Sequence, residues 1–143
     1  MPIRNSAKAL IVRDGHVLTI EHGDERGIYY ALPGGGQEPG ETLTEAVVRE
    51  CREELGADVA VTGLAFIRER VDEVPDHRVE FVFRCTLLTE LDRERATRPD
   101  DGQRGLAWLP LARLEQTRFY PLGLRSFLVH ASDDRTRYLG HLR

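Results

Sequence analysis

The stretch GGGQEPGE at residues 34–41, together with the segment 42–55 that follows it, decides the fold of this chain. Three consecutive glycines and a Pro-Gly pair exclude a helix or a regular strand, so this stretch is expected to be a loop held close to another part of the molecule. Thr42 is followed three residues later by Glu45, which is a capping-box pattern, and Gly56 is a typical stop signal. We therefore predict a helix over residues 42–55, with a loop on either side of it.

Three glutamates of the predicted helix share one surface. The helix also has an apolar stripe, which consists of Leu43, Val47, Cys51 and Leu55. Glu50, Glu53 and Glu54 fall beside this stripe or within its edge. Spacings of three and four residues place carboxylates roughly 5–6 Å apart, and each such pair repels by roughly 3 kcal/mol at an effective dielectric of about 20. A divalent cation would remove the conflict, because hard oxygen ligands suit magnesium, manganese or calcium. The alternative is a glutamate-rich face that is simply solvated.

The spacing of these residues resembles the Nudix box, Gly-x5-Glu-x7-Arg-Glu-U-x-Glu-Glu-x-Gly-U, in which U is a bulky aliphatic residue. Gly35, Glu41 and the run RECREELGA at residues 49–57 match all of its fixed positions. Cys51 and Ala57 depart from the pattern, since they occupy the two U positions. Both are small and apolar, so they are expected to keep the loop-helix-loop but to loosen its packing.

Composition is consistent with one soluble domain over residues 1–143, with the Nudix box at residues 35–57. The chain is 41% hydrophobic and 31% charged, as expected for a globular protein with its own core. A net charge of −4 argues against a dedicated nucleic-acid binder. Cys51 and Cys85 have no metal-site spacing and are predicted to be buried free thiols in a reducing compartment. With no signal peptide and no apolar run of membrane length, a cytoplasmic location away from membranes is expected.

Turn residues and side-chain periodicity predict the remaining elements. A hairpin is expected from residues 6–13 and 16–22, with Asp14 and Gly15 as its turn. Further strands are predicted over residues 28–32, 59–71, 77–87 and 106–109. Gly63 is expected to form a bulge in the longest of these strands.

Less regular segments separate and follow the strands. Residues 72–76 are predicted to be a loop, and residues 90–105 are charged, lack periodicity and are expected to be flexible. A short helical turn is predicted over residues 110–114, and a closing helix over residues 121–131. No structure is assigned to the tail after residue 132.

The pattern of elements indicates the fold class. Strands on both sides of one helix, followed by a C-terminal helix, suggest an α/β protein with a mixed sheet between helices. The resemblance implies the same fold, because Nudix proteins share an α/β/α sandwich with a mixed central sheet and a loop-helix-loop catalytic motif.

The resemblance also implies Mg²⁺-dependent hydrolysis of a nucleoside diphosphate linked to another moiety, with Mn²⁺ as a possible replacement. Carried over from the family, the metal ligands are Glu50, Glu53 and Glu54, and the carbonyl of Gly34 or Gly35 is an additional oxygen ligand. Glu50 and Glu54 are the first candidates for direct contact with the ion, because they are spaced i, i+4.

Two further residues of the box are expected to support the ligands. Arg49 and Glu41 should form an ion pair that ties the loop to the helix and holds a ligand carboxylate in place. Family members take their catalytic base either from the box or from a distant loop. Within the box, Glu53 is the first candidate for the base.

Outside the box, Glu80 is the strongest acidic candidate for contact with metal, water or substrate. In mid-strand it is more often part of a cross-strand ion pair, and His77 is a weaker candidate that is more often a surface residue. An arginine-rich face could contact substrate phosphates, and it consists of Arg68, Arg70, Arg78 and Arg84.

Substrate identity is less determined by the sequence. Pro75 lies later than the proline associated with ADP-ribose hydrolysis, and no tyrosine occurs between Tyr30 and Tyr120 to indicate dinucleoside polyphosphates. The chain looks more like the MutT-like group, which acts on small nucleotide substrates. The alternatives are a non-catalytic sensor of a nucleotide or sugar-nucleotide, and an RNA-processing Nudix protein, although nucleic acid is an unexpected partner. A homodimer is possible.

Overall fold

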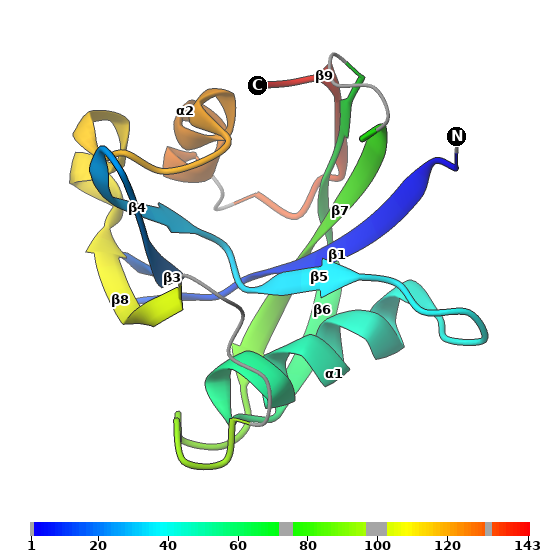
Figure 1. Cartoon of the computed structure of the whole chain (residues 1–143), viewed down its shortest axis with the longest axis horizontal. Coiled ribbons are helices and arrows are strands. Elements are labelled where there is room, and N and C mark those ends of the chain that lie inside the picture. The colour runs from blue at the N-terminus through cyan, green and yellow to red at the C-terminus, as the bar shows by residue number, and fades with distance from the viewer. Residues whose placement is uncertain (1, 72–75, 97–102, 131–132) are drawn as a thin grey trace.

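The computed structural model describes residues 2–71, 76–96, 103–130 and 133–143 (Figure 1). Its larger sheet has the strand order β5 (Gly34–Gly36), β1 (Arg4–Leu10), β7 (Arg78–Leu87), β6 (Val59–Arg70) and β9 (Arg137–His141). β1 runs parallel to β7 and β9 runs parallel to β6, whereas the other two pairs are antiparallel. This arrangement confirms the predicted α/β class with a mixed sheet.

A second sheet, which is antiparallel, is built around β3 (His16–Asp24). β3 pairs with β2 (Val12–Arg13), β4 (Gly27–Ala31) and β8 (Gln103–Pro110). The sequence indicates most of these strands but not their division between two sheets. That division depends on pairing between distant segments, which local patterns do not encode.

The predicted hairpin turn is present, but the strand before it is divided. Asp14 and Gly15 both have positive φ, 51° and 72°, as a two-residue hairpin turn requires. β2 and β3 pair across this turn. The strand expected over residues 6–13 is interrupted after Leu10, because β1 belongs to the larger sheet and β2 to the smaller one.

The box helix forms as predicted. α1 (Leu43–Leu55) is capped by Thr42, whose hydroxyl accepts a hydrogen bond from the Glu45 amide, while the Glu45 carboxylate accepts one from the Thr42 amide. Gly56 ends the helix in the left-handed conformation, with φ 61°. A Cβ at this glycine would lie 1.7 Å from a backbone oxygen, so glycine is required there.

The core consists of two clusters on opposite faces of the larger sheet. On β1, Ala9 belongs to the cluster beneath α1, whereas its neighbour Leu10 belongs to the cluster beneath the C-terminal helices. Figure 1 shows α1 on one side of β5 and the C-terminal helices on the other. Cys51 and Cys85 are buried free thiols in the first cluster, as predicted. Layers on both faces of the sheet agree with the expected sandwich.

Several element boundaries differ from the sequence prediction. Residues 34–36, whose glycines were expected to exclude a regular strand, form the short strand β5, because they pair with β1. β6 shifts register near Gly63, which confirms the bulge. β8 begins at Gln103, so the end of the segment expected to be flexible, residues 103–105, is a strand that pairs with β3. Residues 72–75 of the predicted loop and residues 97–102 lie outside the described residues.

The C-terminal part is less regular than predicted. The helical turn after Pro110 is the 3-10 helix η1 (Leu111–Gln116). The predicted closing helix is a 3-10 turn, η2 (Leu122–Leu124), followed by α2 (Arg125–Val129). β9 lies in the tail to which no structure was assigned, and it forms an edge of the larger sheet. Among the described residues, no helix is long and apolar enough to cross a bilayer.

Candidate active site

Arg49 is the centre of the hydrogen-bond network at the box. Its guanidinium donates to both carboxylate oxygens of Glu41, at 3.0 and 2.7 Å, and to the Gly36 carbonyl at 2.9 Å. Nη1 also donates to Glu50 Oε1 at 3.0 Å and to Glu53 Oε2 at 3.2 Å. The bond from Arg49 lowers the pKa of Glu41 below its usual range. The expected Arg49–Glu41 ion pair is therefore present, and it joins the loop to two carboxylates of the helix.

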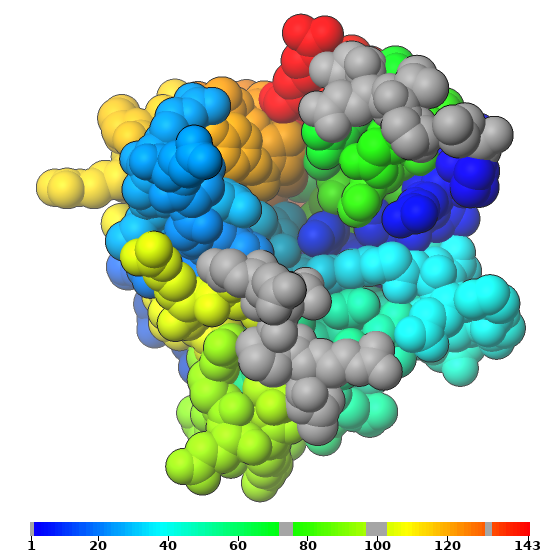
Figure 2. Space-filling view, viewed as in Figure 1, coloured from blue at the N-terminus to red at the C-terminus, as the bar shows by residue number. Residues whose placement is uncertain are grey.

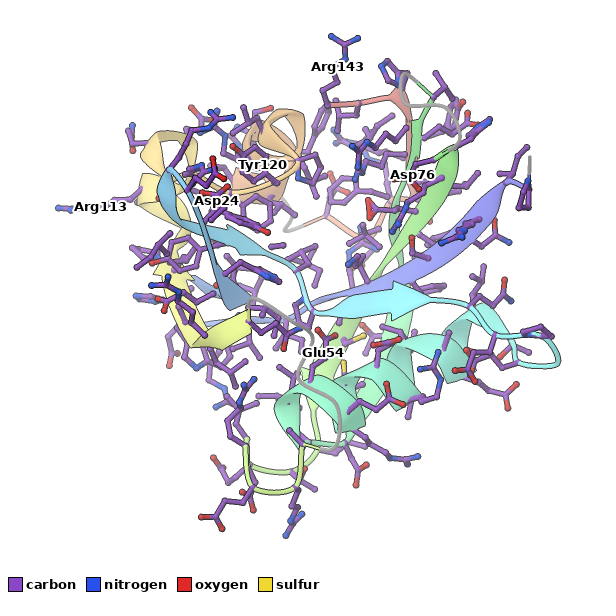
Figure 3. All side chains as sticks on the ribbon, in the orientation of Figure 1. Asp24, Glu54, Asp76, Arg113, Tyr120 and Arg143 are labelled. Carbon is purple, nitrogen blue, oxygen red and sulfur yellow. The ribbon has the colours of Figure 1, made fainter. Side chains whose placement is uncertain are left out.

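Glu54 lies on the inner side of α1 and is almost completely buried, at 3% exposure. Its Oε1 accepts a hydrogen bond from the Gly34 amide at 2.7 Å, and its Oε2 accepts one from Gln103 Nε2 at 2.7 Å. Figure 3 shows this side chain between α1 and the sheet. Burial raises the pKa of Glu54 to about 7, against opposing effects of the Lys8 charge and these hydrogen bonds.

Glu50 lies against the backbone of the glycine stretch. A Cβ at Gly35 would lie 2.6 Å from Glu50 Oε1, so this carboxylate occupies space that only glycine leaves open. Burial raises the pKa of Glu50, and the charge of Glu50 in turn raises the pKa of Glu54. Two carboxylates are therefore desolvated close to each other, which is unfavourable unless a cation is nearby.

These residues fit a hard divalent cation. Glu50 and Glu54 supply carboxylate oxygens beside the backbone of Gly34 and Gly35, which is the donor chemistry that magnesium and manganese prefer. Glu50 and Glu53 both accept hydrogen bonds from Arg49, whereas Glu54 does not and is more deeply buried than either. Within the described residues, no three acidic, histidine or cysteine side chains form a preassembled metal cluster.

The raised pKa of Glu54 predicts how the stability of the metal-free protein depends on pH. The folded-state pKa of about 7 exceeds the ordinary value of 4.5, so the protonated form is favoured by folding. This contribution is fully present below pH 4.5 and is lost as pH rises through 7. In EDTA we expect the wild type to lose roughly 2–3 kcal/mol relative to Glu54→Gln between pH 5 and 8. Urea unfolding of both proteins at each pH measures this difference, and parallel stability curves would contradict it.

A cleft of about 610 Å³ lies on the face of the larger sheet opposite α1. Figure 2 shows the surface hollowed between the β3–β4 hairpin and the strands β1 and β7. The basic residues that line it are Lys8, Arg26, Arg68, Arg70, Arg118 and Arg143. Of the acidic residues that the structure describes, only Asp24 and Glu80 do so. The cleft is thus strongly positive although the whole chain carries −4, and such a cleft attracts anions.

One wall of the cleft combines aromatic rings with a guanidinium. The Arg118 guanidinium lies 5.2 Å from the Tyr29 ring centroid and 5.4 Å from that of Tyr120. Asp24 accepts two hydrogen bonds from Arg118, which lower the pKa of Asp24. Tyr29 also stacks on His22, with centroids 5.0 Å apart. Figure 3 shows Asp24 and Tyr120 close together beside β4. This wall offers flat apolar surfaces with polar groups at their edge.

Of the residues predicted to contact substrate, some line the cleft and others do not. Arg68 and Glu80 line the cleft and form a buried ion pair with each other. Arg78 instead bonds to Asp76, and Arg84 donates to backbone carbonyls at Leu64 and Arg135. Neither Arg78 nor Arg84 lines the cleft, so their predicted role has no support from geometry.

Several cleft residues were not singled out from the sequence. They are Lys8, Asp24, Tyr29, Arg118 and Tyr120. The segment carrying Arg118 and Tyr120 pairs with β4 through backbone hydrogen bonds to Tyr30. A signal was present for Lys8, which is the single lysine of the chain. None of the others has a local pattern that indicates a site.

Comparison with known proteins adds a second line of observation. The NUDIX domain family model matches residues 2–128. A nucleoside triphosphatase NudI from Klebsiella pneumoniae (strain 342) is 40% identical over 86 residues, which are 55% of this chain and 61% of that protein. Another, from Enterobacter sp. (strain 638), is 33% identical over 108 residues, which are 70% of this chain and 77% of that protein. The chain thus spans less than two thirds of the Klebsiella protein.

The fold of this chain is also similar to that of a solved structure. The crystal structure of a MutT NUDIX hydrolase from Burkholderia pseudomallei matches with a TM-score of 0.73 and 26% identity, over 93% of this chain and 100% of that chain.

Proposed function

The chain belongs to the Nudix family, and we propose that it hydrolyses a phosphoanhydride bond in a nucleoside diphosphate joined to another moiety. The observation that carries this proposal is the desolvated Glu50–Glu54 pair at the glycine stretch, together with a cleft in which basic residues outnumber acidic ones. One buried and one half-buried acid close to a positive cleft suit a cation and a polyphosphate bound together.

Mg²⁺ is the proposed cofactor, with Mn²⁺ as a replacement. Glu50 and Glu54 would hold it, with Glu53 and the carbonyl of Gly34 or Gly35 as further candidate ligands. When bound, such an ion neutralises phosphate charge and acidifies the attacking water.

The chain's own groups would then position the reaction. Arg49 holds the Glu50 carboxylate and the Gly36 carbonyl in fixed positions. The glycine stretch therefore keeps its position relative to the helix. Glu53 Oε is our proposed acceptor of the proton from the attacking water, because this carboxylate is more accessible than that of Glu54. Glu80 bonds to Arg68, and we assign this pair to the cleft wall.

A nucleotide is the substrate class that the cleft suits best. Arg118 with the two tyrosines offers stacking surfaces for a base, and the basic residues suit phosphates. The curated relatives are nucleoside triphosphatases, which supports small nucleoside triphosphates as the first substrates to test.

The test is a substrate panel of nucleoside triphosphates, ADP-ribose, dinucleoside polyphosphates and NADH. Released phosphate is measured with Mg²⁺ or Mn²⁺, with and without added phosphatase, which separates pyrophosphate from monophosphate products. We expect turnover of at least one nucleotide and none in EDTA. Nucleotide binding without turnover under either metal would contradict hydrolysis and favour the sensor alternative. Salt-sensitive binding of RNA would favour the RNA-processing alternative.

The Arg49 network predicts a specific loss of activity. Arg49→Lys keeps the positive charge but removes the paired contacts with Glu41 and the contact with the Gly36 carbonyl. We expect kcat/KM to fall about 10- to 100-fold, as for other groups that orient metal ligands. The matched control is Arg52→Lys on the same helix, since the exposed Arg52 side chain bonds, among the described residues, only to Asp58. Equal activity of the two variants would show that Arg49 does not position the site.

A further inference from the structure

Lys8 lies where the cleft meets the box. In the larger sheet it pairs with Gly34 of β5 on one side and with Val82 of β7 on the other. Its neighbours on β1, Ala7 and Ala9, belong to the core cluster beneath α1. Because successive side chains of a strand alternate between faces, Lys8 points to the opposite face, and it lines the cleft there.

The ammonium group of Lys8 is close to the box as well. Nζ donates a hydrogen bond to the Gly34 carbonyl at 3.2 Å. The positive charge of Lys8 also acts on the box carboxylates, because it opposes the effect of burial, which raises the pKa of Glu50 and Glu54. Lys8 therefore lines the cleft and also contacts the glycine stretch, next to the two acids proposed to hold the metal.

The path of the Lys8 side chain is fixed by the glycine stretch. A Cβ at Gly34 would lie 2.7 Å from the Cα of Lys8 and 2.9 Å from its Cδ, so the stem runs directly over this glycine. A lysine ammonium has three N–H donors, and only the Gly34 carbonyl accepts one of them among the described residues. The remaining donors suit an anionic oxygen arriving from the cleft.

We propose that the Lys8 ammonium binds a phosphate oxygen of the substrate at the junction between cleft and box. The contact would fix the phosphate chain at the point where it passes from the cleft to the carboxylates. A compact ammonium suits this place, because it acts as a point charge for phosphate on a flexible stem. This inference rests on the proposed hydrolysis of a phosphoanhydride, since it assigns a role in binding that substrate.

The first test measures binding without metal. Inorganic triphosphate and the four deoxynucleoside triphosphates are titrated into the protein in EDTA by calorimetry. Lys8→Met, which keeps most of the unbranched stem but loses the charge, is expected to weaken triphosphate binding about tenfold. The matched control is Arg113→Met, which removes one positive charge from an exposed residue that does not line the cleft. Figure 3 shows Arg113 pointing away from the body of the molecule.

The second test uses Lys8 as a probe, because it is the only lysine of the chain. Reductive methylation with ¹³C-formaldehyde labels Lys8 and the α-amine while keeping their positive charge. Comparison with labelled Lys8→Arg identifies the Lys8 signal. We expect this signal to shift when inorganic triphosphate is added in EDTA, an effect that a purely structural lysine would not show.

Each outcome decides the inference. A shifted signal together with weaker binding by Lys8→Met supports it. An unchanged signal while triphosphate binds, equal affinities of Lys8→Met and wild type, or no triphosphate binding at all, would overturn it. Failure of the substrate panel would reject the proposed hydrolysis separately, because triphosphate binding is read without turnover.

Discussion

Replacing Glu54 by glutamine is expected to lower kcat about 1,000-fold with a small effect on folding. Glutamine is nearly isosteric, and its carbonyl oxygen can still accept the hydrogen bond from Gly34 or Gln103. The negative charge is lost, however, and Glu54 is the most deeply buried acid of the box. Loss of one preorganised electrostatic group at a reacting centre commonly costs about 10²–10³ in rate. Steady-state kinetics with the best nucleotide of the panel measure this effect.

Glu45→Gln is the matched control for Glu54→Gln. Glu45 lies on the same helix, but its carboxylate caps the N-terminus by accepting from the Thr42 amide. A capping box functions with either glutamate or glutamine, so activity should be retained. Full activity of Glu54→Gln, or an equal loss in both variants, would contradict the role that we assign to Glu54.

Gly34→Ala is expected to cause a large loss of stability, about 4 kcal/mol. Gly34 has φ 138°, a conformation that side chains rarely adopt. A Cβ there would lie 2.2 Å from the Ala7 carbonyl oxygen, which is backbone and cannot move aside without breaking the β1–β5 pairing. Urea unfolding measures the loss. If Gly34→Ala is not obtained folded, we expect a lower yield of soluble protein than for the control variant Gly36→Ala.

Gly36→Ala provides the control for this substitution on the same strand. No atom lies within 4 Å of a Cβ built at Gly36, and its φ is not positive. We therefore expect its stability to lie within about 0.5 kcal/mol of the wild type. Similar stabilities for the two variants would show that the glycine stretch does not depend on close approach at Gly34.

The box helix could be predicted because its signals are local. Thr42, Glu45 and Gly56 lie at its ends, and the structure shows both halves of the capping box and the left-handed stop. The Arg49–Glu41 contact was implied by the resemblance to the Nudix box, and the structure shows it. Such short-range features do not depend on the rest of the fold.

The different orientations of the three acidic side chains were less predictable. Spacing places Glu50, Glu53 and Glu54 on one surface but does not determine their rotamers. In the structure Arg49 binds Glu53, while Glu54 turns inward to the Gly34 amide. The partners of Glu54 lie outside the helix, at Gly34 and Gln103, whereas the partner of Glu53 is Arg49 on the helix itself.

The cleft could not be predicted from the sequence. Lys8, Tyr29 and Arg118 come from segments far apart in the chain, and the pairing of residue 30 with the segment 118–120 brings two of them together. β9 was missed for a similar reason. Its five residues carry a weak strand signal, and pairing with the edge of β6 makes them a strand.

The central claim is that Glu50 and Glu54 hold a divalent cation next to a bound nucleotide. The most direct measurement is titration calorimetry of Mg²⁺ or Mn²⁺ into the protein saturated with a non-hydrolysable nucleotide, for the wild type and for the double variant Glu50→Gln, Glu54→Gln. We predict metal binding by the wild type and at least a hundredfold weaker binding by the double variant, since both carboxylate ligands are lost. Metal binding that is equal in the two proteins, or absent from the wild type, would contradict the claim.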